Sequence, residues 1–137
     1  MKEEDMKIVI DTSVIIAVIA NEPQRESLLQ VTLGAELLAP QSVHWEVGNA
    51  FSAMMKRNKI TIKEARKALS VYGVIPIRFV DIELSESLEI SDKLKIYAYD
   101  AYLLSCSLKT HSPLLTLDDG LKSAAKTLNI KLAGGVL

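Results

Sequence analysis

The chain has 137 residues, and at roughly 100–200 residues per domain this length predicts a single domain over residues 1–137. Its composition, 49% hydrophobic and 24% charged, is that of an ordinary globular protein and excludes a disordered, collagenous or coiled-coil chain. The net charge of −1 excludes a protein that binds nucleic acid over its whole surface, but it leaves room for a local basic patch.

Three features bear on the cellular compartment. The chain has one cysteine, Cys106, which cannot form an internal disulfide and therefore favours a reducing cytoplasm. The apolar segment 8–20 is interrupted by Asp11, and residues 1–7 before it carry two lysines against three acids, 2 − 3 = −1, unlike a signal peptide. The longest unbroken apolar run, 14–20, is far shorter than the ~20 residues of a membrane span. We therefore expect a cytoplasmic protein with no membrane partner.

Short apolar runs alternate with stretches of helical periodicity, which predicts strands alternating with helices. In chain order we expect strand 7–10, helices 14–20 and 23–33, strand 36–39, helices 42–58 and 62–72, strand 75–80, helices 84–94 and 99–109, strand 113–117, helix 121–128 and a weak strand 130–132. Ser42 is expected to cap its helix, Thr61 and Glu64 form a capping box, and Leu84, Leu88 and Leu94 mark the inner side of helix 84–94. This order predicts an α/β domain with a mainly parallel sheet.

Four acids fall near one edge of such a sheet, where the carboxyl ends of parallel strands meet the amino ends of the following helices. Asp11 follows the first strand directly, and Asp118 follows the fourth. Glu46 lies in the first turns of the helix after the second strand, and Asp100 opens the helix that leads to the fourth. Carboxylates from distant parts of the chain are therefore expected to converge.

Each acid also has a structural interpretation, because Asp11 and Asp118 suit helix caps and Glu46 and Asp100 suit solvated positions in a first helical turn. The apolar sequence around Asp11 and Asp100 favours a functional site instead. Four neighbouring negative charges repel one another unless a cation neutralises them, and an all-oxygen site without a Cys/His pattern suits Mg²⁺ or Mn²⁺. Such ions act on phosphates and activate a bound water for attack. Topology does not decide whether Asp81, in a generally acidic stretch, or Asp119 takes part.

Four segments in order carry a family resemblance: residues 8–17 (IVIDTSVIIA), 46–50 (EVGNA), 99–101 (YDA) and 115–118 (LTLD). Together they resemble PIN-domain ribonucleases of the compact VapC type, the toxins of toxin–antitoxin pairs. The resemblance implies a PIN-like three-layer domain with a mainly parallel five-stranded sheet flanked by helices, and a metal-dependent endoribonuclease. It also implies a homodimer and a small antitoxin protein. It assigns the catalytic and metal-binding positions to Asp11, Glu46, Asp100 and Asp118, and supporting positions to Ser13, Asn49 and Thr116.

A basic stretch at residues 56–67 adds an expected RNA contact, since six basic residues outnumber one acid there, 6 − 1 = +5. The candidate RNA-binding residues are Lys56, Arg57, Lys59, Lys63 and Arg66. The alternative interpretation of this basic stretch is an ordinary helix face that contacts solvent only.

The leading hypothesis is a Mg²⁺- or Mn²⁺-dependent endoribonuclease toxin in which Asp11, Asp100 and Asp118 hold the principal ion. Glu46 would hold a second ion or orient the attacking water. A non-catalytic PIN-like module that binds RNA or protein is one alternative, and the intact set of acids argues against it. A Mg²⁺-dependent phosphatase is another, but it usually has a second Asp two residues after the first, where this chain has Ser13.

Overall fold

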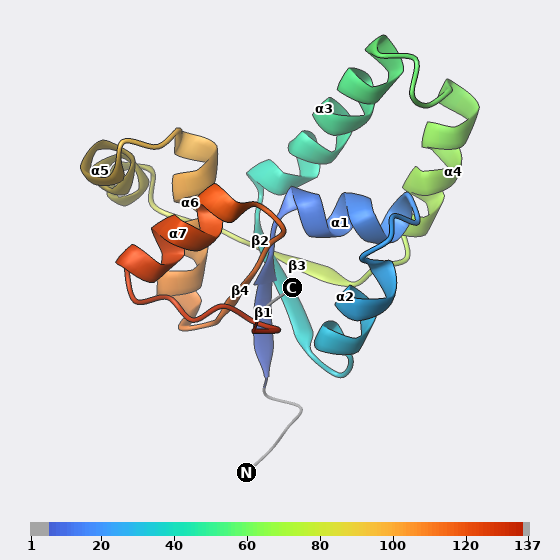
Figure 1. Ribbon diagram of the computed structural model, residues 1–137. Helices are drawn as coiled ribbons and strands as arrows, with labels where there is room; N and C mark the ends of the chain where they lie inside the picture. Colours follow the sequence, from blue (N-terminus) through green and yellow to red (C-terminus); the bar gives the residue numbers. More distant parts are fainter. Residues whose placement is uncertain (1–5, 136–137) are drawn as a thin grey trace.

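The computed structural model describes residues 6–135. Residues 1–5, which carry most of the charged segment weighed above against a signal peptide, lie outside the described residues. Within residues 6–135, one parallel sheet has the strand order β3-β2-β1-β4 (Figure 1). The strands are β1 (Lys7–Ile10), β2 (Glu36–Pro40), β3 (Ile77–Val80) and β4 (Leu114–Leu115).

The inner strand β1 is held on both sides by apolar partners. Val9 lies opposite Leu38 of β2 on one side and Leu114 of β4 on the other. All three residues are fully buried. A continuous β-branched run buried on both faces is typical of a central strand in a parallel sheet that helices cover on both sides.

Helices cover the two faces of the sheet. They are α1 (Thr12–Ile19), α2 (Arg25–Thr32), α3 (Ser42–Lys56), α4 (Ile62–Tyr72), α5 (Leu84–Leu94), α6 (Ala98–Thr110) and α7 (Asp119–Thr127). Figure 1 shows α5, α6 and α7 on one side of the strands and α1 to α4 on the other. Helix α6 packs directly against β1, β2 and β4, and α1 packs against α2, α3 and α4. The α/β architecture with a parallel sheet between helical layers is therefore confirmed.

The described residues form four strands where five were expected. The segment expected as strand 130–132 contributes one isolated parallel bridge, between Leu114 and Leu132. Strand β4 itself covers two residues instead of the expected 113–117. Because β4 is this short, it offers the last segment only one paired position, with hydrogen bonds to the backbone of Lys131 and Ala133.

Two local expectations were wrong. Ser42 does not cap α3, because Gln41 before it already has helical backbone angles and occupies the cap position. Leu84 and Leu88 of α5 are more than half exposed, and the buried residue of that helix is Ser87, whose hydroxyl shares a hydrogen bond with that of Ser105. Helix α5 packs on α6, and its Ile90 and Leu94 are partly buried against the hydrophobic core. Of the three leucines, Leu94 therefore lies on the inner side as expected.

Since all four strands run in one direction, their carboxyl ends face the same edge of the sheet. The segments that leave this edge begin at Asp11 after β1, Gln41 after β2, Asp81 after β3 and Thr116 after β4. Among the described helices, none is both long enough and apolar enough to cross a membrane.

Candidate active site

Asp11 is the most buried carboxylate at this edge, with 4% of its surface exposed. Its Oδ1 accepts hydrogen bonds from the Ser13 hydroxyl at 2.6 Å and from the Val14 amide at 3.1 Å. Its Oδ2 accepts a hydrogen bond from the Thr116 hydroxyl. Burial raises the pKa of Asp11 more than these hydrogen bonds lower it, and the charge of Asp118 raises it further. Asp11 therefore caps α1, while its surroundings disfavour the charged form of its carboxyl group.

The same hydroxyls tie the end of β1 to the segment after β4. The Leu117 amide donates to the Ser13 hydroxyl at 3.0 Å, and the Asp118 amide donates to the Thr116 hydroxyl at 3.0 Å. Asp118 in turn caps α7, with Oδ1 accepting from the Leu121 amide at 2.9 Å. Two acids that lie 107 positions apart in the sequence are thereby held in one hydrogen-bonded unit.

Glu46 lies one turn into α3, half-buried, and its pKa is raised to about 7. Burial is the main cause, and the charges of Asp11 and Asp100 add to it, whereas the hydroxyls of Ser42 and Thr12 lower it. Its Oε2 is buried, as are the two hydroxyl oxygens, and none of the three completes a hydrogen bond of normal geometry with a described residue. The side chain is therefore held near other negative charges, which the two hydroxyls offset only in part.

Asp100 completes the group from the first turn of α6. It is partly buried, and its pKa is raised, first by burial and then by the charge of Asp118. Asp11 interacts with Glu46 and Asp118, and Asp100 interacts with the same two residues. The structure thus brings the four acids expected from the sequence, contributed by four separate segments, into mutual electrostatic contact.

This donor set fits a hard divalent cation in charge and in atom type, since it consists of carboxylate and hydroxyl oxygens. Burial and negative neighbours raise the pKa values of Asp11, Glu46 and Asp100, and no cationic side chain of residues 6–135 is among the groups that lower them. Among residues 6–135, no three acidic, histidine or cysteine side chains stand close enough to hold an ion together. Asp11 and Asp118 instead point oxygens at helix amides, so ion binding requires these carboxylates to share or release those hydrogen bonds.

Three other residues considered in the sequence analysis have exposed positions. Asn49 is exposed on α3, one turn after Glu46. Asp119 is exposed and lies 3.9 Å from the Lys122 ammonium. Asp81 is exposed at the end of β3, where its carbonyl accepts a hydrogen bond from Lys109.

The basic stretch and the cysteine also have clear positions. The expected RNA-binding residues are all exposed at the end of α3, in the turn that follows and on α4: Lys56, Arg57, Lys59, Lys63 and Arg66.

Cys106 is fully buried in α6, and burial raises the pKa of its thiol to about 11, so it is a core residue rather than a nucleophile.

Sequence reasoning missed two hydroxyls, those of Thr12 and Ser42, which act on Glu46. Thr12 directly follows Asp11, and a polar residue between an acid and Ser13 was a usable signal for it. Ser42 precedes Glu46 by four residues on the same helix, a spacing at which side chains face each other, so it too had a usable local signal.

Comparison with known proteins identifies the family. A family profile described as PIN domain matches residues 8–127. A comparison with curated proteins gives no match.

Three solved structures have a similar fold. The protein PAE2754 of Pyrobaculum aerophilum aligns with 19% identity over 90% of this chain and 94% of its own, with a TM-score of 0.60. VapC20 of Mycobacterium tuberculosis, described as a sarcin-ricin loop cleaving toxin, aligns with 14% identity over 85% and 94%, with a TM-score of 0.60. A chain of VapBC2 from Rickettsia felis, bound to a DNA fragment from its promoter, aligns with 15% identity over 93% and 97%, with a TM-score of 0.64.

Proposed function

The chain belongs to the PIN domain family, and from this premise we propose that residues 1–137 act as one metal-dependent endoribonuclease domain that hydrolyses phosphodiester bonds in RNA. The observation that carries the proposal is Glu46, which is half-buried beside Asp11 and Asp100 with a pKa of about 7 and an unpartnered Oε2. A structural role would supply a cation or enough donors to offset the charge fully, because a buried unpaired charge is costly. A site that binds a cation for function explains why no cationic side chain among residues 6–135 partners Glu46.

The proposed roles follow from position. Asp11, Asp100 and Asp118 hold a principal Mg²⁺ or Mn²⁺ ion, and Glu46 holds a second ion or orients the attacking water. When bound, such an ion supplies positive charge to a phosphoryl oxygen and lowers the pKa of a water molecule. Ser13 and Thr116 keep the Asp11 carboxylate in place through their hydrogen bonds. Asn49, exposed one turn beyond Glu46, supports the site from its rim.

We further propose that the protein is the toxin of a type II toxin–antitoxin pair, works as a homodimer and is blocked by a small antitoxin protein. Support comes from the similar folds of VapC20, described as a cleaving toxin, and of a chain in VapBC2. Expression of the chain in a bacterial host should arrest growth, and co-expression of a small protein encoded beside its gene should restore it. Growth arrest that persists with the Asp100→Asn variant would count against a nuclease toxin.

The decisive experiment for the nuclease is cleavage of an end-labelled single-stranded RNA. The purified chain should cut it with Mg²⁺ or Mn²⁺ and should stop when EDTA is added. Asp100→Asn should abolish cleavage, whereas Asp119→Asn, which neutralises an exposed neighbouring acid, should leave it within about twofold of wild type. Undiminished cutting in EDTA would refute the metal-dependent mechanism.

The two alternatives give different results in the same assay. A non-catalytic PIN-like module would bind the RNA or a protein partner and leave the RNA intact with either ion. A phosphatase would release inorganic phosphate from an RNA end or a phosphomonoester without shortening the chain.

A further inference from the structure

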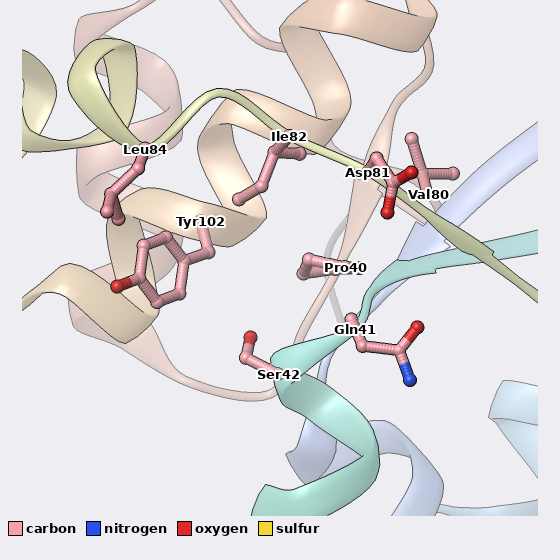
Figure 2. Close-up of a pocket in the computed structure, with 8 residues that line it drawn as sticks. All are labelled: Pro40, Gln41, Ser42, Val80, Asp81, Ile82, Leu84 and Tyr102. Atoms are coloured by element: carbon pink, nitrogen blue, oxygen red, sulfur yellow. The ribbon is translucent and has the colours of Figure 1, made fainter.

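A small cavity opens beside the group of four acids. It has a volume of about 210 Å³ and lies among the ends of β2 and β3, the start of α5 and helix α6. Figure 2 shows Tyr102 and Leu84 on one side of it and Asp81 with Gln41 on the opposite side. Its lining residues are Pro40, Gln41, Ser42, Val80, Asp81, Ile82, Leu84 and Tyr102.

The cavity and the proposed active site share one residue, Ser42. This residue lines the cavity, and its hydroxyl also acts on the Glu46 carboxylate. Helix α6 borders both regions, because it carries Asp100 in its first turn and contributes Tyr102 to the cavity. We therefore expect a base seated in the cavity to belong to a nucleotide near the phosphate held at the acids.

The lining selects an uncharged, partly apolar group. Val80, Ile82, Leu84 and Pro40 supply aliphatic walls and Tyr102 an aromatic ring, while the lining includes a carboxylate and neither Lys nor Arg. The volume is below the roughly 300–1,000 Å³ of pockets for drug-sized ligands, so it suits one planar ring system. Unstacked bases of single-stranded RNA are recognised in this way, on aromatic side chains and by their polar edges.

The polar end of the cavity favours one base. An ionised carboxylate only accepts hydrogen bonds, and a side-chain amide both donates and accepts them. Guanine alone presents two neighbouring donors, N1–H and the N2 amino group, beside the O6 acceptor. Asp81 can accept from both donors while Gln41 donates to O6. Adenine and cytosine place an acceptor next to their amino donor, and uracil flanks its single donor with two acceptors.

We propose that this cavity is a base subsite of the RNA substrate that prefers guanine, with Tyr102 as its stacking wall and Asp81 as its specificity determinant. The proposal rests on the proposed function, since it takes RNA as the substrate.

Equilibrium binding of labelled RNA in EDTA tests the subsite without requiring cleavage. The probes are oligouridine nonamers with a central G, A, C or U. Wild type should bind the G probe about tenfold more tightly than the all-U probe, the size expected for a two-bond contact to a base edge. Asp81→Asn should reduce that ratio to below about twofold. Glu83→Gln, a matched change of an exposed acid that does not line the cavity, should keep it.

The stacking wall has its own pair of variants. Tyr102→Ala should weaken binding of the G probe roughly tenfold, whereas Tyr102→Phe, which keeps the ring, should bind within about twofold of wild type. Thermal melts of each variant show whether it is folded, and the Phe variant remains informative if the Ala variant unfolds.

Equal binding of all four probes by wild type, or equal ratios for Asp81→Asn and Glu83→Gln, would overturn the subsite. The proposed nuclease is judged separately. A chain that cuts RNA with no base preference would refute the subsite and leave the nuclease standing. A guanine preference that depends on Asp81, in a chain that never cuts RNA, would support the subsite and refute the nuclease.

Discussion

At the scale of single residues, Glu46 makes a specific prediction about pH. The folded protein retains the Glu46 proton up to about pH 7, whereas the unfolded chain releases it near the ordinary value of 4.5. The stability contributed by the protonated acid is therefore complete below pH 4.5 and is lost as the pH rises through 7. Because the side chain is only half-buried, solvent screening reduces the effect to roughly 1–2 kcal/mol.

Replacing Glu46 with Gln should remove this loss. In EDTA, the free energy of unfolding of Glu46→Gln should exceed that of wild type by ~1–2 kcal/mol at pH 8, with little difference at pH 4.5. Urea unfolding at the two pH values measures it. Glu89→Gln, on the exposed face of α5, should change stability by less than about 0.5 kcal/mol at both. An advantage of Glu46→Gln at low pH only would contradict the raised pKa.

Thr116 is the second residue whose role can be tested alone. It is 2% exposed, donates to Asp11 Oδ2 and accepts from the Asp118 amide. Thr116→Val keeps the shape but leaves both partners without this hydroxyl, which should cost ~1–3 kcal/mol in EDTA. Thr127→Val is the control, because the Thr127 hydroxyl donates to a carbonyl on the exposed end of α7. Chemical denaturation should show near-wild-type stability for the control. Equal stability of the two variants would show that the Thr116 hydroxyl does not support Asp11.

At the scale of elements, the two helices that follow β1 and β4 begin at acids that cap them and that we also propose as metal ligands. Asp11 caps α1 and Asp118 caps α7, each by accepting from an amide three residues later. The cap and site interpretations, which the sequence left as alternatives, describe the same side chains. A cap anchors a carboxylate at the end of a strand with one oxygen engaged. The other oxygen of Asp118, and remaining lone pairs on Asp11, stay available to a cation.

The basic stretch at the end of α3 and on α4 is predicted to contact RNA. Ten residues of α3 separate Glu46 from Lys56, about 15 Å along the helix axis, so a strand of RNA that reaches the acids can extend to these residues. Replacing Lys59, Lys63 and Arg66 together with Gln should weaken RNA binding similarly for all sequences. The slope of log affinity against log salt should fall by about 2, for three lost contacts to single-stranded RNA.

The matched control removes the same charge elsewhere. Lys93, Lys126 and Lys131 are exposed on other parts of the molecule, and their triple Gln variant should keep the wild-type salt slope. Binding titrations at several salt concentrations compare the two. An identical slope in both triple variants would assign the basic stretch to an ordinary solvated surface.

At the scale of the whole molecule, the four acids place a strain on the fold that a cation relieves. Two like charges ~4 Å apart repel by roughly 1–4 kcal/mol between the dielectric limits of water and protein surface. Excess Mg²⁺ should therefore raise the thermal midpoint of wild type, by an amount that corresponds to ~2.7 kcal/mol at a hundred times the dissociation constant. Asp100→Asn should melt at or above the wild-type temperature in EDTA and respond weakly to Mg²⁺.

Asp119→Asn provides the comparison, since it removes one exposed acid and should respond to Mg²⁺ like wild type. Clear destabilisation of Asp100→Asn in EDTA would indicate a structural carboxylate, because breaking a buried pair costs ~3–5 kcal/mol. Differential scanning calorimetry in EDTA and in excess Mg²⁺ separates the two results.

The sequence by itself determined which segments become strands and helices, and which acids stand at their junctions. Strand β1, the capping box of α4 and the caps at Asp11 and Asp118 all depend on residues within about four positions of one another. Such local hydrogen bonds and apolar periodicities can be read without knowing the fold. The parallel order of the strands then follows from the alternation of elements, so the convergence of the four acids was predictable as well.

Only the tertiary structure decided the environment of those acids. The two-residue length of β4, the approach of Thr12 to Glu46, and the cavity shared by Asp81 and Tyr102 depend on segments tens of residues apart. Packing sets these distances and the burial of each carboxylate, and burial is the largest contribution to the raised pKa values of Asp11, Glu46 and Asp100. A sequence pattern records which side chains are present at an edge, whereas desolvation depends on how closely the rest of the chain surrounds them.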